Sequence, residues 1–336
     1  MREFIPDKIL YEPAALTYPL GKELAERYTD MRLPLEQIRS HNQIEAMRSQ
    51  PNAHFAKMKR CLVIGVRKTH IYRPNFKVSD FLVPYTSSGC PAMCLYCYLV
   101  CHYNKCAYLR LFVNREQMLE KLIRKAASYS EQKVFEIGSN SDLVLENTIT
   151  NNLVFTIQEF CAQPKGVLTF PTKFDMVAPL LPLEHKGRVI ARVSLNPDSI
   201  IWHTEFGTCR LAQRIEAINQ LCEAGYPVGI LIAPVIFVDG WEGLYAELIE
   251  QVADMLSEKA KRTVFFEVIF MTYSYVHDQI NQAAFPGAMQ IYRKEDMTVR
   301  GRGKYRYKDE LKKKGEAFFR IRLTKAFPGA KIVYIV

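Results

Sequence analysis

From about residue 81 to residue 270 the chain alternates short apolar runs with amphipathic stretches. The apolar runs are rich in Val, Ile and Phe and are nearly continuous, which is typical of strands buried on both faces. Six strands are predicted, at residues 81–85, 133–137, 167–170, 189–194, 228–233 and 264–269. Helical periodicity between them predicts helices that include residues 115–130, 211–224 and 243–259. Alternating β and α units of this kind predict an α/β fold with a parallel, partly closed barrel.

The segments on either side of this region follow a different pattern. Residues 1–80 are expected to form an N-terminal segment that packs on the barrel at 81–270, and they contain a strand-like run at 61–66. Residues 271–336 are expected to form a C-terminal extension with a basic stretch, a charged helix and a last strand at 331–336. In a parallel barrel the chemistry lies at the carboxyl ends of the strands.

Composition and charge narrow the class of protein. The chain has 336 residues, a formal net charge of +10 and a pI near 9.1, and this balance favours a polyanionic partner. No apolar run is long enough to span a bilayer, and the polar N-terminus lacks a secretory signal. Nine cysteines, an odd number, indicate a reducing compartment rather than a disulfide framework. We therefore predict a cytoplasmic protein, with the spore interior as one such place, and no membrane partner.

The densest chemical signal is the cysteine loop at Cys90, Cys94 and Cys97. The spacing C-x3-C-x2-C places three thiolates on one short loop, where they can hold three corners of a [4Fe-4S] cluster and leave the fourth iron open. This loop resembles that of radical S-adenosylmethionine (SAM) enzymes, in which the open iron binds SAM. Structural zinc completed by Cys101, His102 and Cys106 is the alternative. Zinc sites usually pair two tight C-x2-C knuckles and this chain has one, so the cluster is favoured over zinc, and zinc over disulfides.

Further motifs follow in order over nearly the whole chain and resemble the spore photoproduct lyase family. They are Tyr11-Glu12-Pro13, Tyr18-Pro19-Leu20-Gly21, Ser40-His41-Asn42-Gln43, Val63 to Thr69, Gly89 to Leu99, Tyr108-Leu109-Arg110, Val113-Asn114, Phe135-Glu136, Ser141-Asp142, Thr172-Lys173-Phe174, Ser194-Leu195-Asn196, Ala233-Pro234, Gly240-Trp241 and Phe266-Glu267. The resemblance implies a partial (β/α)6 radical-SAM barrel with a C-terminal β-hairpin and helix extension. It also implies a lyase that reverts 5-thyminyl-5,6-dihydrothymine in DNA to two thymines through a 5′-deoxyadenosyl radical. A [4Fe-4S] cluster, SAM and a low-potential electron donor are the implied cofactors and partner.

The same resemblance implies residues for SAM. Ser141, Lys173, Ser194, Asn196 and Ala233 stand where the family lines its SAM site, and hydroxyls, an amide and a lysine suit the polar groups of SAM. Taken singly, such residues often only cap a helix or a turn.

Two tyrosines, Tyr96 and Tyr98, flank Cys97. Each has two interpretations: a path for a protein radical, or packing that covers the cluster. Packing is at least as good an account of Tyr96, and a radical role is favoured for Tyr98.

A basic, aromatic stretch near the C-terminus matches the family's Gly-x-Gly-Lys-Tyr. Arg300, Arg302 and Lys304 are expected to contact phosphates, and Tyr305 to stack on a base. An ordinary charged surface hairpin is the alternative. The match fails just before it, at Thr298-Val299-Arg300, and also over residues 271–284, so lesion recognition is expected to differ in detail.

The largest departure from the family is Ser139. It stands where family members carry a cysteine that donates hydrogen to the thymine-allyl radical, and an alcohol O–H bond is too strong for that step. An engineered Cys→Ser variant, a natural branch with another donor, and a changed reaction would each explain it. Neighbours Ile137, Gly138 and Asn140 also differ from the family, which favours the natural branch.

Two cysteines beyond the cluster loop are candidates for the missing donor. We hypothesise that Cys101 or Cys106, with Tyr98 as a relay, replaces it. Small buried residues are the alternative interpretation of both cysteines.

Two rival functions remain at this stage. One is a radical-SAM enzyme that acts on another nucleic acid or a small molecule. The other is a non-catalytic nucleic-acid-binding protein that uses its cysteines for zinc or as a redox sensor.

Overall fold

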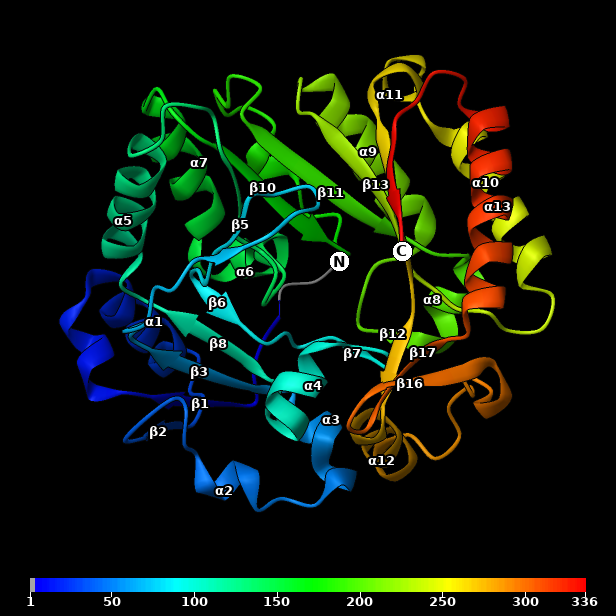
Figure 1. Ribbon diagram of the computed structural model, residues 1–336. Coiled ribbons are helices and arrows are strands. Elements are labelled where there is room, and N and C mark those ends of the chain that lie inside the picture. The colour runs from blue at the N-terminus through cyan, green and yellow to red at the C-terminus, as the bar shows by residue number, and fades with distance from the viewer. Residues whose placement is uncertain (1–3) are drawn as a thin grey trace.

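A curved eight-stranded sheet forms the centre of the molecule in the computed structural model, which describes residues 4–336 (Figure 1). Its strands run in the order β18-β14-β13-β11-β10-β9-β5-β4, and every neighbouring pair is parallel except β4 and β5. Their bounds are β4 Arg73–Pro74, β5 Phe81–Leu82, β9 Val134–Glu136, β10 Val167–Thr172, β11 Val189–Leu195, β13 Val228–Val235, β14 Phe265–Phe270 and β18 Ile332–Ile335. All six predicted strands and the α/β partial barrel are confirmed.

The central strands form where the sequence is apolar on both faces. Six of the seven residues of β11 are buried, because helices cover one side of the sheet and polar residues of the site fill the other. Strand β5 is shorter than predicted. Pro84 lacks an N–H group and cannot continue the hydrogen-bond ladder, so pairing stops just after Val83 donates to the carbonyl of Glu136.

Helices pack around the outside of this sheet (Figure 1). They are α5 Arg115–Ala127, α6 Leu143–Thr150, α7 Asn152–Ala162, α8 Asp198–Thr204, α9 Leu211–Glu223, α10 Trp241–Met255, α11 Glu258–Thr263 and α13 Asp309–Ala326. Helices α5, α9 and α10 lie close to their predicted bounds. Within residues 4–336 no helix is long and apolar enough to cross a membrane.

A second sheet joins the N-terminal segment to the barrel. Its order is β2-β1-β3-β8-β6, with bounds β2 Leu35–Gln37, β1 Lys8–Tyr11, β3 Cys61–Gly65, β8 Leu109–Phe112 and β6 Ser87–Ser88. Two of these strands come from beyond residue 80, so the first 80 residues share a sheet with the segments on either side of the cysteine loop. The division of the chain at residues 80 and 270 stays a prediction.

Three of the family-like motifs meet at Glu12. Its carboxylate accepts hydrogen bonds from the backbone N–H and Nδ1 of His41 and from the N–H of Val66, at 2.8 to 2.9 Å. Burial alone would raise the pKa of Glu12, but these hydrogen bonds hold it at about 2. Gly65 lies directly against this group, since a Cβ atom there would lie 2.9 Å from Glu12 Oε2.

The C-terminal extension forms the expected hairpin and helix. A small antiparallel sheet has the order β15-β17-β16, with bounds β15 Thr272–Ser274, β17 Lys304–Tyr307 and β16 Met297–Gly301. Helix α12, Tyr275–Ala284, follows β15 and packs near α4, Leu99–Tyr103, which begins directly after the cysteine loop.

Candidate active site

The cysteine loop lies between the two sheets. Gly89 precedes Cys90 with a φ of +77°, and a Cβ atom there would come within 1.9 Å of the carbonyl oxygen of Tyr108, so only glycine fits. Cys90 is buried, while Cys94 and Cys97 are half-buried. A short strand, β7 (Met93–Cys94), pairs antiparallel with β12 (Glu205–Phe206) and places Cys94 opposite Glu205. The backbone of the loop is thus fixed at two points, at Gly89 and at Cys94.

The three thiols suit a cluster better than a single ion. Burial raises the pKa of Cys90 to about 12, and burial with the nearby Glu205 carboxylate raises the pKa of Cys94, so a metal must displace these protons. Residues 4–336 contain no group of three or more His, Cys, Asp or Glu side chains arranged to hold one metal ion. Ligands of a zinc ion must converge on one point, whereas a cluster binds each thiolate through a different iron. Three cysteines on one loop are the number of protein ligands that a [4Fe-4S] cluster with one open iron needs.

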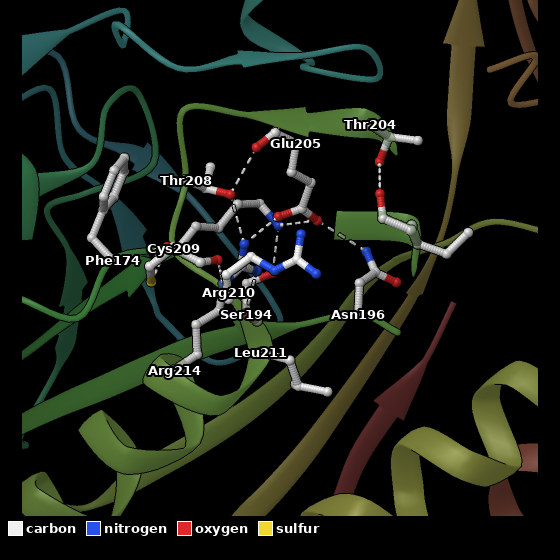
Figure 2. A network of polar contacts seen from close by, with 12 residues as sticks. Phe174, Ser194, Asn196, Thr204, Glu205, Thr208, Cys209, Arg210, Leu211 and Arg214 are labelled. Carbon is white, nitrogen blue, oxygen red and sulfur yellow. Dashed lines mark hydrogen bonds and ion pairs between the residues drawn. The ribbon is translucent and has the colours of Figure 1, made fainter. Parts of the chain in front are cut away.

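Four of the five residues expected to line a SAM site meet at the carboxyl ends of β10, β11 and β13. The amine of Lys173 donates to Ser194 Oγ at 2.6 Å and to the carbonyl oxygen of Ala233 at 3.0 Å. Ser194 Oγ also donates to the Ala233 carbonyl, at 2.9 Å. Asn196 Nδ2 donates to the carbonyl oxygen of Pro234 at 3.1 Å, and Figure 2 shows Ser194 and Asn196 converging on one network.

Glu205 lies at the centre of this network and was not identified from the sequence (Figure 2). Its side chain is fully buried and accepts from Arg214 at 2.6 Å, Asn196 at 3.2 Å and Lys173 at 3.4 Å. Burial alone would raise the pKa of Glu205, but the charges of Arg214 and Lys173 hold it at about 2. Glu205 is therefore ionised and fixes the lysine amine at the strand ends.

Tyr96 and Tyr98 differ in their surroundings. Tyr96 is buried and its hydroxyl donates to Glu205, which ties the cysteine loop to the polar network. Tyr98 is 49 % exposed, so its phenol is accessible beside the loop. The packing interpretation suits Tyr96, and the radical role of Tyr98 stays a prediction.

The fifth residue, Ser141, supports the cysteine loop instead of joining the network. Its hydroxyl donates to the carbonyl oxygen of Gly89 at 2.7 Å, and the N–H of Gly89 donates to the carbonyl oxygen of Asn140 at 2.8 Å. Ser139, where the resemblance predicts a donor cysteine in the family, lies in the same turn, is half-buried and precedes Asn140, whose carbonyl contacts the cluster loop. Gly138 is the other constraint on this turn, because a Cβ atom there would lie 3.1 Å from the side chains of Phe170 and Pro171.

The two donor candidates lie in different environments. Cys101 Sγ lies 3.3 Å from Ser274 Oγ and 3.7 Å from Nδ1 of His277, whose Nε2 lies 2.7 Å from the carbonyl oxygen of Cys97. Cys106 is buried in a small apolar cluster beside Tyr108. The sequence alone did not single out His277, because its partners come from the loop some 180 residues earlier.

The hairpin places its cations in solvent. Arg300, Arg302 and Lys304 are exposed and Tyr305 is half-buried. The charge of Lys304 acts on His102 of α4, and the charge of Arg300 acts on Lys77, in the turn between β4 and β5. The hairpin therefore extends toward the cysteine loop and the open edge of the barrel.

Comparison with known proteins gives one consistent result. The sequence model of the spore photoproduct lyase family matches residues 4–336. Spore photoproduct lyase of Bacillus subtilis is 32% identical over 98% of both chains, and that of Geobacillus sp. is 30% identical over 99% of both. Two solved structures, spore photoproduct lyase complexed with dinucleoside spore photoproduct and a double mutant with bound AdoMet and the same lesion, each match with a TM-score of 0.92 at 30% identity over 100% of both chains.

Proposed function

Because the chain belongs to the spore photoproduct lyase family, we propose that it is a radical-SAM lyase that reverts the spore photoproduct to two thymines. One observation carries the proposal: the cysteine loop is hydrogen-bonded to the polar network at the strand ends, through Tyr96 and Glu205. On this proposal the cluster ligands and the SAM-binding groups form a single site, as the reaction requires.

Each part of the site has a defined task. Cys90, Cys94 and Cys97 would hold a [4Fe-4S] cluster, and Lys173, Ser194, Asn196 and Ala233 would hold SAM. When bound, the cluster and SAM supply the 5′-deoxyadenosyl radical that takes hydrogen from C6 of the lesion. The chain itself orients these groups, because Glu205 and Arg214 fix Lys173, while Ser141 fixes the turn before Cys90. Fixed polar groups of this kind hold a reactive centre against one C–H bond and exclude competing reactions.

The lesion must leave the DNA stack to reach this site. A damaged, poorly stacked base pair is extruded at lower cost than a normal one. Arg300, Arg302 and Lys304 would hold phosphates next to the lesion, with Tyr305 against a base. The reaction also needs a low-potential electron donor, and we expect it to occur in the cytoplasm or the spore interior, where the DNA is.

We further propose that Cys101 replaces the cysteine that is absent at Ser139. Its S–H bond would break as a C–H bond forms on the thymine-allyl radical, which leaves one thiyl radical on Cys101. Tyr98 would return a hydrogen atom to that sulfur, and the radical left on Tyr98 would take one electron from the low-potential donor and one proton from solvent, so atoms and electrons balance. Cys101 contacts His277, whose Nε2 also contacts the carbonyl oxygen of Cys97 in the cluster loop, whereas Cys106 is buried beside Tyr108, so Cys101 is the better donor of the two.

Anaerobic reconstitution tests the reaction. The chain should take up iron and sulfide, absorb light as a four-iron cluster does, cleave SAM on reduction and release thymine from dinucleoside spore photoproduct. SAM cleavage without thymine release would refute the lyase and leave a radical-SAM enzyme with another substrate. Zinc uptake in place of a cluster would refute both.

Alanine substitutions test the donor, with Cys106→Ala as the matched control for Cys101→Ala. We expect Cys101→Ala to cleave SAM normally but to divert product from thymine to adducts, because the allyl radical is no longer quenched. Cys106→Ala should keep its thymine yield. Equal thymine yields from both variants would exclude Cys101.

A further inference from the structure

A cavity of about 480 Å³ lies outside the site described above, between the second sheet and the segment that follows the cysteine loop. Residues from four separate parts of the chain line it. Those that bear charge or can acquire it are His41, Arg48, Arg67, His102, Lys105 and Arg110. No carboxylate is among the lining residues, so the cavity is positively charged.

Two of its arginines are held in place without a counter-ion. Arg110 is 6 % exposed, and its guanidinium donates to three carbonyl oxygens, those of His41 at 3.2 Å, Cys106 at 2.9 Å and Tyr108 at 3.4 Å. Arg67 donates to the carbonyl oxygens of Tyr85 at 2.7 Å and Ser87 at 3.4 Å.

Within residues 4–336 neither guanidinium lies within ion-pairing distance of a carboxylate. Burial lowers the pKa of Arg67 to about 10, so it is still charged at neutral pH.

Such charges are costly in a protein interior unless an anion compensates them. Burial of an unpaired ion costs several kcal/mol of folding free energy, and a bound counter-ion offsets part of this cost. Guanidinium groups bind phosphate oxygens through charge-assisted hydrogen bonds, and the remaining N–H groups of Arg67 and Arg110 would serve this purpose. Arg48 and Lys105 add two further cations at the edge of the same cavity.

Helix α4 lies close to both the cavity and the hairpin. His102 of α4 lines the cavity. The positive charges of Lys304 on the hairpin and of Arg73 in β4 also act on His102. The cations of the hairpin and those of the cavity are therefore both close to α4. A DNA strand held by the hairpin would have its phosphates close to these cations.

We propose that this cavity binds a phosphate group. The phosphate is either a phosphodiester of the strand that flanks the lesion or a free phosphate, and only the first source rests on the proposed function. Arg67 and Arg110 form the inner wall of the site, and Arg48 and Lys105 form its rim.

The test removes the two rim cations, Arg48 and Lys105. It leaves Arg67 and Arg110 unchanged, because both also donate hydrogen bonds to backbone carbonyl oxygens. The double variant Arg48→Gln/Lys105→Gln is compared with Lys313→Gln/Lys325→Gln, which removes two exposed lysines from α13 on the other side of the molecule (Figure 1). Titration with inorganic phosphate should show binding to the wild type and to the control, and binding at least about tenfold weaker to the rim variant. That outcome establishes the free-phosphate source.

The second arm uses an oligothymidine over a range of salt concentrations. If the cavity takes a phosphodiester, the slope of log K against log salt falls by about 1 in the rim variant and is unchanged in the control. If neither phosphate nor oligothymidine distinguishes the rim variant from the control, the proposal is wrong.

Repair of the dinucleoside lesion separates this proposal from the proposed function. That substrate carries no phosphate, so the rim variant should release thymine as fast as the wild type does. The remaining outcome is that neither the wild type nor the variants release thymine, although phosphate still binds the rim variant more weakly than the control. In that case the lyase assignment fails and the phosphate site stands.

Discussion

Glu205 connects the parts of the site that the chain keeps far apart in sequence. It accepts from Tyr96, which is 109 residues away, and from Arg214 and Lys173. No local motif marks it, because its role arises only when β12 returns to pair with the cysteine loop. Lys173, Ser194 and Asn196 could be predicted as site residues because each lies at or just after the end of an apolar strand and matches the family.

Replacement of Glu205 by Gln should destabilise the protein by about 3–5 kcal/mol, because Arg214 would be left as a buried, uncompensated charge. Urea unfolding measures this difference, and Glu23→Gln, in an exposed pair with Arg27, should cost less than about 1 kcal/mol. A loss at Glu205 no larger than that at Glu23 would show that the buried pair is not as described.

The stability difference between wild type and Glu205→Gln should also depend on pH. The pKa of Glu205 is lowered from 4.5 to about 2, so its carboxylate stabilises the fold above the unfolded value. That contribution is lost as pH falls from about 4.5 toward 2. Unfolding curves recorded through this range should therefore converge, and a constant difference would contradict the assignment.

At the scale of elements, Glu12 joins β1, β3 and the segment that contains His41. Gly65 of β3 has no room for a side chain, because a Cβ atom there would lie 2.9 Å from Glu12 Oε2 and 3.0 Å from His41 Nδ1. The family-like motifs at these three places therefore have a structural cause rather than a catalytic one.

Gly65→Ala should lower the free energy of unfolding by about 1–3 kcal/mol through overpacking. Gly243→Ala in α10 is the matched control, since nothing lies within 4 Å of its added Cβ. That control should be neutral or more stable by up to about 1 kcal/mol, because alanine favours helix. Chemical denaturation compares the two, and equal effects would exclude the tight contact at Gly65.

The central strands were predictable, and much of the rest of the architecture was not. Short, continuous apolar runs such as those of β11 and β13 indicate strands that are buried on both faces. Helices α6 and α7 were missed because most of their residues are buried, which hides the amphipathic period. The second sheet was missed because β6 has two residues and β8 four, and their partners are far away in the sequence. Strand β8 pairs with β3, tens of residues before it, and β6 pairs with β8, some twenty residues after it.

The whole molecule carries a net charge of +10, and the hairpin extends part of it into solvent. Each phosphate contact that is lost should reduce the salt dependence of DNA binding. Arg300→Gln and Arg302→Gln should each lower the slope of log K against log salt by about 1, as fluorescence anisotropy would measure. Lys313→Gln on α13 serves as the control, and slopes that stay equal in all variants would place the DNA elsewhere.

Repair of dinucleoside spore photoproduct in D₂O is the most direct test of the account. Thiol hydrogens exchange with solvent, so the reconstituted wild type should release thymine that carries one deuterium atom for each lesion repaired. Cys101→Ala should lose this labelled thymine while it still cleaves SAM. Release of unlabelled thymine by the wild type, or cleavage of SAM with no thymine released, would contradict the account.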